Sequence, residues 1–216
     1  MATGSNGAEA RRVERFGYTA AVLSLVLYVL FDMAAVAGMT GLVTSPFIIS
    51  LSWYAPSLLL AYSFLGMTIA MHIDGISAVK LYSLCAVALA VIYATLNSFV
   101  YVIQVMVIAP SFLSHTSEAV SIFEMAEHRP LYAVNGLAYT IMGFSTLFLA
   151  ASIRKGGPGR GVKTALFIHG IVAPAVLGAL LFKPLFALSA TVGITYPVSA
   201  ALIARYFRRS GPGQAR

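Results

Sequence analysis

The stretch KLYSLCAVALAVIYATLNSFVYVIQVMVIAP, residues 80–110, is an almost unbroken apolar run that decides the fold class. At a rise of about 1.5 Å per residue, a helix of this length spans roughly 45 Å, more than the hydrocarbon core of a bilayer, which is about 30 Å thick. One long or tilted transmembrane helix is therefore expected. Its polar and aromatic residues recur at helical spacing, and they form a face that we expect to point away from lipid. The residues of this face are Tyr93, Asn97, Tyr101 and Gln104.

The composition of the chain indicates a membrane protein. Hydrophobic residues make up 59% of the 216 residues and charged residues only 10%, whereas soluble domains are typically about 25% charged. The formal net charge of +7 does not indicate a nucleic-acid partner, because the basic residues flank apolar runs instead of gathering on a soluble segment. Cys85 is the only cysteine, so the sequence contains no disulfide framework and no CxxC motif.

Six apolar segments alternate with polar ones. We expect an all-α integral membrane protein, a six-transmembrane-helix bundle in one domain, with basic tails at residues 1–15 and 208–216. Ala35-Val36-Ala37 resembles a signal-peptidase site, but the apolar stretch before it is long for a signal peptide and contains Asp32, so a retained span is the simpler interpretation. The expected spans are 16–43, 46–71, 80–110, 130–153, 163–182 and 185–207.

The basic residues predict the orientation of the spans. Of the 14 Lys and Arg residues, all but Arg129 and Lys183 fall on one side when six spans alternate across a membrane. The positive-inside rule then places both termini in the cytoplasm and the acidic 111–129 connection outside. We expect a multi-pass protein of the cell (plasma) membrane.

Some spans share short patterns. The second and fourth contain Leu-Ala-Tyr-Ser/Thr followed three residues later by Gly, beginning at Leu60 and Leu137. The first and third share Ala-Val with Tyr and a polar residue further along, beginning at Ala21 and Ala86. These matches are compatible with a parallel repeat of helix hairpins, and also with chance similarity among apolar helices.

Asp32 is the most informative single residue, because an ionisable group inside a span is costly and indicates a functional site by default. Counting along the helices from Arg15 and Lys80 places Asp32 and Asn97 at the same depth, roughly 25 Å from the cytoplasmic edge. Three roles fit the carboxyl group: a proton donor, the counter-ion of a cation, or a hydrogen-bond partner of Asn97 that joins two helices.

Further polar and aromatic residues fall in the same outer layer of the membrane, at the outer ends of the second and fourth spans. We therefore expect an outward-facing polar and aromatic pocket among the first four helices. Its expected ligand-binding residues are Asp32, Asn97, Tyr101, Gln104, Trp53, Tyr54, Asn135 and Tyr139.

The sequence gives little indication of a metal or cofactor site. A divalent cation could be held only by the connection before the fourth span, which contains His115, Glu118, Glu124 and His128. Imidazoles and carboxylates in an exposed loop are more simply solvated, so neither a metal nor a cofactor is expected. The GxSxG, HExxH and phosphate-loop motifs are missing. His169 has no second histidine at helical spacing, and we interpret it as a packed helix residue rather than a haem ligand.

Three functions stay open. We favour binding or transport of a small amphiphilic or lipid-like molecule in the outward-facing pocket. The second is an intramembrane acid–base enzyme, a cyclase, isomerase or hydrolase of an isoprenoid or another lipophilic substrate, with Asp32 as the acid and Glu124 or Glu127 as alternatives. The third is an accessory subunit that docks on a membrane-protein partner or forms a homo-oligomer. The expected partners are thus the lipid bilayer and an amphiphilic ligand, with no nucleic acid.

Overall fold

The computed structural model describes residues 3–74, 76, 78–154 and 159–209, and the regular elements within them are helices. Six of the helical segments are long and apolar enough to cross a membrane. The prediction of an all-α membrane protein with six spans is therefore confirmed. The spanning segments are Gly7–Met39, Pro46–Ile73, Lys80–Leu113, Pro130–Ser152, Arg160–Gly178 and Leu185–Arg209.

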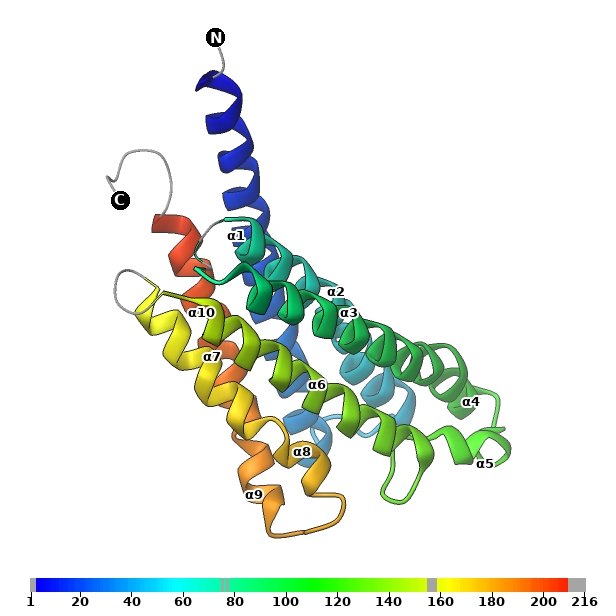
Figure 1. The fold of residues 1–216 in the computed structure, drawn as a ribbon. Coiled ribbons are helices and arrows are strands. Elements are labelled where there is room, and N and C mark those ends of the chain that lie inside the picture. Colours follow the sequence, from blue (N-terminus) through cyan, green and yellow to red (C-terminus); the bar gives the residue numbers. More distant parts are fainter. Residues whose placement is uncertain (1–2, 75, 77, 155–158, 210–216) are drawn as a thin grey trace.

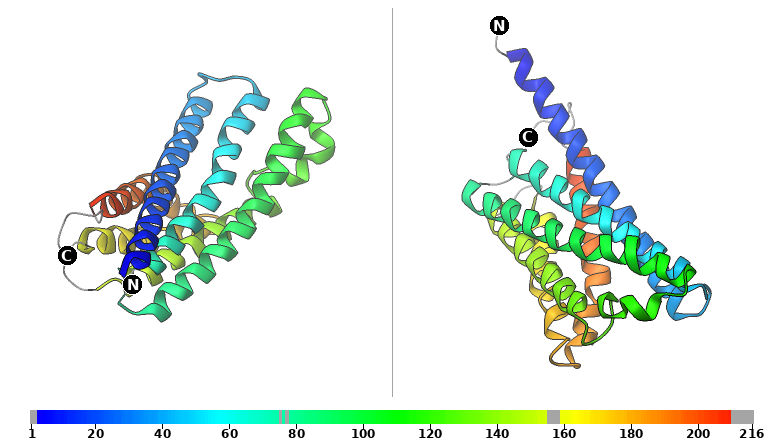
Figure 2. Two further views of the ribbon diagram at one scale, coloured as in Figure 1. Left: turned by 90° about the horizontal axis from the view of Figure 1, so that it is seen from above. Right: turned by 90° about the vertical axis from the view of Figure 1, so that its right-hand side faces the viewer.

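The spans form a closed ring. Helix α1 (Thr3–Met39) packs against α2 (Pro46–Ile73), α2 against α3 (Lys80–Ile103), and α3 against α6 (Pro130–Ser152). The ring continues from α6 to α7 (Arg160–Val172) and from α7 to α10 (Val192–Arg209), which packs back on α1. Figure 2 shows α2 between α1 and α3. All six spans therefore surround one interior. Both termini lie at the same end of the bundle (Figure 1).

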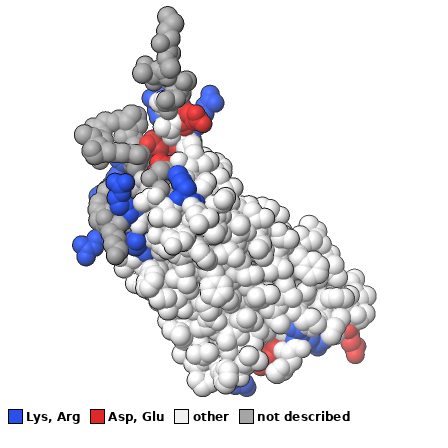
Figure 3. All heavy atoms as spheres, viewed as in Figure 1, with Lys and Arg blue, Asp and Glu red and all other residues white. Residues whose placement is uncertain are grey.

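The distribution of charge fits a bilayer. On the face shown in Figure 3, Lys, Arg, Asp and Glu gather at the two ends, and a wide band between them carries none. Large apolar side chains in the spans are exposed, including Leu81, Phe99 and Ile194. Exposing these apolar side chains to water would cost free energy, whereas contact with the hydrocarbon core of a bilayer would not.

Local sequence sets the ends of the first two helices. The first span was expected to reach residue 43, but α1 ends at Met39 because Gly41 adopts a left-handed conformation with φ of 73°. Ser45 then caps α2, its hydroxyl accepting a hydrogen bond from the Ile48 N–H, and Pro46 occupies the first helical position. The expected N-terminal tail is helical from Thr3 onward, while residues 1–2, and 210–216 of the expected C-terminal tail, lie outside the described residues.

The third span has a widened turn. Helix α3 continues directly through the π-helical segment η1 (Gln104–Ile108) into α4 (Ala109–Leu113), and the Ala109 N–H bonds to the carbonyl of Gln104 five residues earlier. Pro110 lacks an N–H, and its ring would clash with the carbonyl four residues before it, so a wider turn relieves the crowding. The connection that follows contains only the short helices α5 (Ser117–Val120) and η2 (Ser121–Phe123).

The last two spans are interrupted. The fifth span was expected to run through residues 163–182, but α7 ends at Val172 and the short α8 (Ala175–Gly178) follows Pro174. Proline removes a backbone donor and crowds the preceding turn, which accounts for the break. The sixth span consists of α9 (Leu185–Ala190) and α10, separated at Thr191.

Candidate functional site

Five tyrosines converge in the interior of the ring. This central tyrosine cluster consists of Tyr28 on α1, Tyr93 and Tyr101 on α3, Tyr139 on α6 and Tyr196 on α10, all of them buried. The rings of Tyr28 and Tyr196 lie 4.8 Å apart, and those of Tyr93 and Tyr139 lie 6.0 Å apart. The hydroxyl groups of Tyr101 and Tyr139 are 3.3 Å apart and share a hydrogen bond.

The remaining two spans also contribute to this interior. Phe64 on α2 links the two tyrosine pairs, since its ring lies 5.4 Å from that of Tyr93 and 6.1 Å from that of Tyr196. His169 on α7 packs its ring 5.4 Å from that of Tyr196, and its Nδ1 atom is hydrogen-bonded to the Thr195 hydroxyl at 3.0 Å. Each of the six spans therefore places an aromatic or imidazole side chain in one connected group.

Several polar atoms in and around this group are buried without a hydrogen-bond partner among the described residues. Leaving such an atom unpaired costs about 1–3 kcal/mol, and folded proteins usually avoid it. Seven such atoms occur among the described residues, and four of them belong to residues expected to bind ligand. The atoms are Trp53 Nε1, Tyr93 Oη, Asn97 Oδ1, Gln104 Oε1, Asn135 Oδ1, His169 Nε2 and Tyr196 Oη. The last of these makes no hydrogen bond of normal geometry but interacts with the Ser24 hydroxyl.

Asp32 lies at the edge of the cluster, at the contact between α1 and α10. It is one helical turn from Tyr28 on the same helix. Its carboxylate oxygens lie 3.7 and 3.8 Å from the position that a Cβ atom on Gly193 would occupy. In the described part of the chain the carboxylate makes no hydrogen bond or ion pair, so the hydrogen bond to Asn97, one of the three roles considered for this carboxyl group, is not present.

The aromatic residues expected to bind ligand on the second and third spans, Trp53, Tyr54 and Tyr101, form a continuous strip. Trp53 and Tyr54 stack with ring centroids 5.7 Å apart, and the Tyr54 ring lies 5.6 Å from that of Tyr101. The Asn97 amide donates to the carbonyl of Ser57. These side chains are thus brought together, and through Tyr101 they join the central tyrosine cluster.

Gln104 and Asn135 lie in two different settings. The Gln104 amide donates to the Phe123 carbonyl at 2.6 Å, which ties the π-helical turn to the connection before α6. Asn135, on the first turns of α6, is partly buried, and its carbonyl oxygen is one of the unpartnered atoms.

A separate cavity of about 600 Å³ lies at the end of the bundle away from the termini. This distal cavity is bounded by the residues before and at the start of α6 and by the hairpin between α8 and α9. Its polar lining consists of Glu127, His128, Arg129, Tyr132 and Lys183. Its apolar lining consists of Pro130, Ala133, Ala179, Leu180 and Phe186. None of the residues predicted to bind ligand lines it.

The structure does not gather a metal site. No group of three or more His, Cys, Asp or Glu side chains converges in a metal-binding arrangement in the residues described, so His115, Glu118, Glu124 and His128 are not brought together as ligands. His115 and His128 share a different feature, since both adopt left-handed backbone conformations, with φ of 57° and 64°.

Sequence reasoning missed three residues of the central group. Tyr28 and Tyr196 were not singled out as site residues, and His169 was interpreted as a packed helix residue; it is indeed fully buried, but its Nε2 atom has no partner in the described chain. One signal was available for Tyr28, because it occupies the same place as Tyr93 in the pattern shared by the first and third spans. Nothing similar marked the residues of the last two spans.

Comparison of the chain with protein-family models, with curated proteins and with solved structures finds no match.

Proposed function

We propose that this membrane protein binds or transports a small amphiphilic molecule whose polar group enters the central tyrosine cluster. The observation that carries the proposal is a connected group of side chains from all six spans, in which the buried atoms Tyr93 Oη and His169 Nε2 have no partner in the described chain. Tyr93 and Tyr196 present hydroxyl groups and His169 presents a ring nitrogen, so donors and acceptors are both available. The rings themselves supply apolar surface to the rest of the ligand.

The energetics favour a bound partner over simple helix packing. A tyrosine hydroxyl without a partner costs more than the phenylalanine that would fill the same space, because the oxygen has lost its water. Polar side chains between transmembrane helices commonly hold the helices together through interhelical hydrogen bonds, but this requires that the donor and the acceptor are both paired. Asn97 meets this condition with its amide and not with its carbonyl oxygen.

Asp32 defines which polar groups the ligand carries. The Asp32 carboxylate lies within a span and has no cationic partner in the described chain. A hydrogen-bond donor or a cation on the ligand, such as an amine, would stabilise it. Aromatic faces next to it, including that of Tyr28, add a favourable surface for positive charge. We therefore place a donor or cationic group of the ligand at Asp32.

The orientation of the protein belongs to the same proposal. Twelve of the 14 Lys and Arg residues lie on the terminal side of the expected topology, and only Arg129 and Lys183 lie on the other. By the positive-inside rule, both termini are cytoplasmic in the cell membrane, and the ligand reaches the cluster from outside.

A second candidate is an intramembrane acid–base enzyme on a lipophilic substrate. It is favoured by the position of Asp32 near the rings of Tyr28 and Tyr196, which lie 4.8 Å apart, since an acid could protonate an alkene while the aromatic faces stabilise the cation. The two candidates differ in outcome: the enzyme releases an altered molecule, and its turnover stops when Asp32 is replaced by Asn.

The proposal is tested by identifying what the purified protein retains. Wild type, Asp32→Asn and Glu118→Gln are purified from native membranes, extracted with organic solvent and analysed by mass spectrometry. Glu118→Gln is the matched control, because it makes the same carboxyl-to-amide change in the 111–129 connection. We expect one discrete molecule in wild type and Glu118→Gln and its loss from Asp32→Asn. Equal retention in all three proteins, or no retained molecule in any, would contradict the proposal.

A further inference from the structure

The distal cavity is a second site, distinct from the central tyrosine cluster. We propose that it holds the head group of a zwitterionic phospholipid, with the lipid phosphate at Lys183 and the lipid ammonium at Glu127. The inference does not rest on the proposed function, because none of the residues lining the distal cavity belongs to the central tyrosine cluster. Either can therefore fail without the other.

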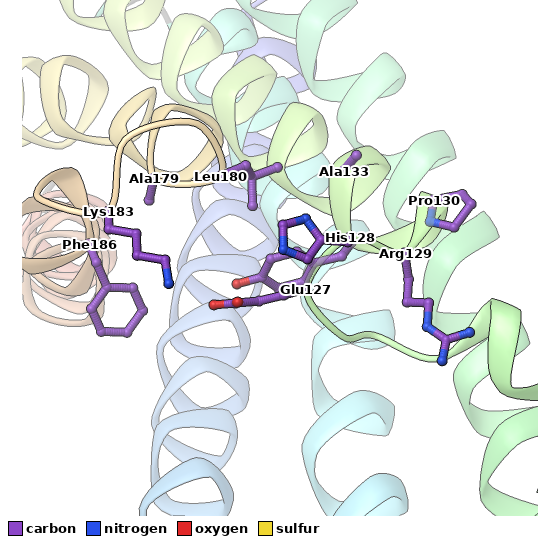
Figure 4. Close-up of a pocket in the computed structure, with 10 residues that line it drawn as sticks. Glu127, His128, Arg129, Pro130, Ala133, Ala179, Leu180, Lys183 and Phe186 are labelled. Atoms are coloured by element: carbon purple, nitrogen blue, oxygen red, sulfur yellow. The ribbon is translucent and has the colours of Figure 1, made fainter.

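Two opposite charges border the same hollow from different parts of the chain. Lys183 comes from the hairpin between α8 and α9, and its side chain extends toward the side on which Glu127 and His128 lie (Figure 4). No ion pair joins Lys183 to Glu127 among the residues that the structure describes. Both charges are thus available to a ligand that carries one charge of each sign.

The charge balance distinguishes a zwitterion from an anionic lipid. Arg129 also borders the cavity, but its side chain extends away from Lys183 (Figure 4). One cation and one anion then face the hollow, and a purely anionic head group would meet repulsion from Glu127. In Figure 4 the His128 ring lies on the same side of the cavity as Glu127, away from Lys183, and it adds a ring nitrogen to the polar lining.

The apolar side of the cavity gives the acyl chains a path. Ala133, Ala179 and Leu180 lie together on one side of the cavity, apart from the charged ends of Lys183 and Glu127 (Figure 4). Phe186 adds an exposed aromatic ring next to Lys183. A volume of about 600 Å³ is within the usual range for small-molecule sites, roughly 300–1,000 Å³.

The position in the bundle selects a membrane lipid over a soluble molecule. The distal cavity lies where α6 begins and where the last two spans turn (Figure 1), beyond the band without charged residues. This is the depth of the lipid head groups, whichever side of the membrane it faces. A phospholipid can occupy the site without leaving the bilayer.

The test measures lipid affinity by native mass spectrometry of the detergent-purified full chain. The probes are phosphatidylethanolamine and phosphatidylglycerol with identical acyl chains. We expect wild type to prefer phosphatidylethanolamine by about tenfold, the usual effect of one charge-assisted contact. Lys183→Gln should weaken binding of phosphatidylethanolamine by about tenfold, and Glu127→Gln should remove the preference between the two lipids. The double variant Glu127→Lys, Lys183→Glu restores both charges in exchanged places and should recover the preference.

Two matched controls complete the design. Glu118→Gln alters an acid that does not line the cavity, and Arg209→Gln removes a cation at the terminal end of the bundle; both should bind like wild type. Equal affinity of wild type for the two lipids, or an equal loss in the control variants, would overturn the proposal. Displacement of phosphatidylethanolamine by soluble O-phosphoethanolamine at the same concentration would overturn the assignment to a lipid.

Discussion

The side-chain amide of Asn97, on α3, donates a hydrogen bond of 2.9 Å to the backbone carbonyl of Ser57, on α2, and joins positions 40 residues apart. The side chain is fully buried, yet its carbonyl oxygen has no partner among the described residues. Asn97 therefore ties two helices with one atom and offers the other to the interior. The same residue belongs to the packing of the bundle and to the candidate site.

Removing this tie should destabilise the bundle. We expect Asn97→Leu to lower the free energy of unfolding by about 1 kcal/mol, the scale of an interhelical hydrogen bond in a membrane protein. The control is Ser98→Ala, which removes an exposed hydrogen bond to the Tyr62 hydroxyl and should change stability by less than about 0.5 kcal/mol. Denaturant titration in detergent gives both values, and equal effects would show that the Asn97 contact contributes nothing specific.

The direction in which Asn97 points could be predicted from sequence, and its partner could not. Helical spacing put Tyr93, Asn97 and Tyr101 on one face, and all three are buried. Depth counting made Asp32 a candidate partner of Asn97, but depth does not specify which helices are neighbours in the ring. Asp32 lies beside Gly193 on the last span, and apolar helices of similar composition carry no signal for that pairing.

The contact between α6 and α7 leaves no room for a Cβ atom on Gly170. A Cβ atom on Gly170 would lie 2.8 Å from the backbone oxygen of Gly143, and backbone cannot move aside as a flexible side chain can. Gly170→Ala should therefore cost about 1–3 kcal/mol of stability. Gly161→Ala on the same helix meets no atom within 4 Å and should stabilise by about 0.5–1 kcal/mol, because alanine favours the helix. Thermal unfolding of the two variants should thus shift in opposite directions, and a shared direction would contradict this account.

Gln104 should hold the connection before α6 in place. Its amide donates to the Phe123 carbonyl at 2.6 Å, so Gln104→Leu removes a fixed contact without removing side-chain volume. We expect faster amide hydrogen exchange in residues 117–123 and unchanged exchange in α7. Exchange that stays slow in residues 117–123 would mean that other contacts hold this segment.

The prediction of the site was least complete in the last two spans. Tyr196 and His169 are single polar residues in apolar helices, and such residues are compatible with ordinary packing. Their place in the central group depends on contacts with Phe64 and Thr195, which the sequence does not indicate. The breaks at Pro174 and Thr191 were likewise underestimated, because the length of an apolar run predicts a span and not an unbroken helix.

The orientation of the chain can be measured by cysteine labelling. Cys85 is the only cysteine, so Cys85→Ala gives a background without thiols. In intact cells a membrane-impermeant maleimide should label Glu118→Cys directly and Arg209→Cys only after the membrane is permeabilised. The reverse pattern would invert the proposed topology and place the distal cavity on the cytoplasmic side.

Ligand retention by the double variant Tyr93→Phe, Tyr196→Phe tests the central claim most directly. The Tyr93 hydroxyl is buried without a partner in the described chain, and the buried Tyr196 hydroxyl interacts there only with the Ser24 hydroxyl, so their removal should change the thermal unfolding midpoint little. Native mass spectrometry should show that retention of the bound molecule falls at least about tenfold, while Tyr18→Phe, Tyr82→Phe, which alters two exposed tyrosines, retains it fully. Undiminished retention in the Tyr93→Phe, Tyr196→Phe protein would show that the central tyrosine cluster packs helices and binds no ligand.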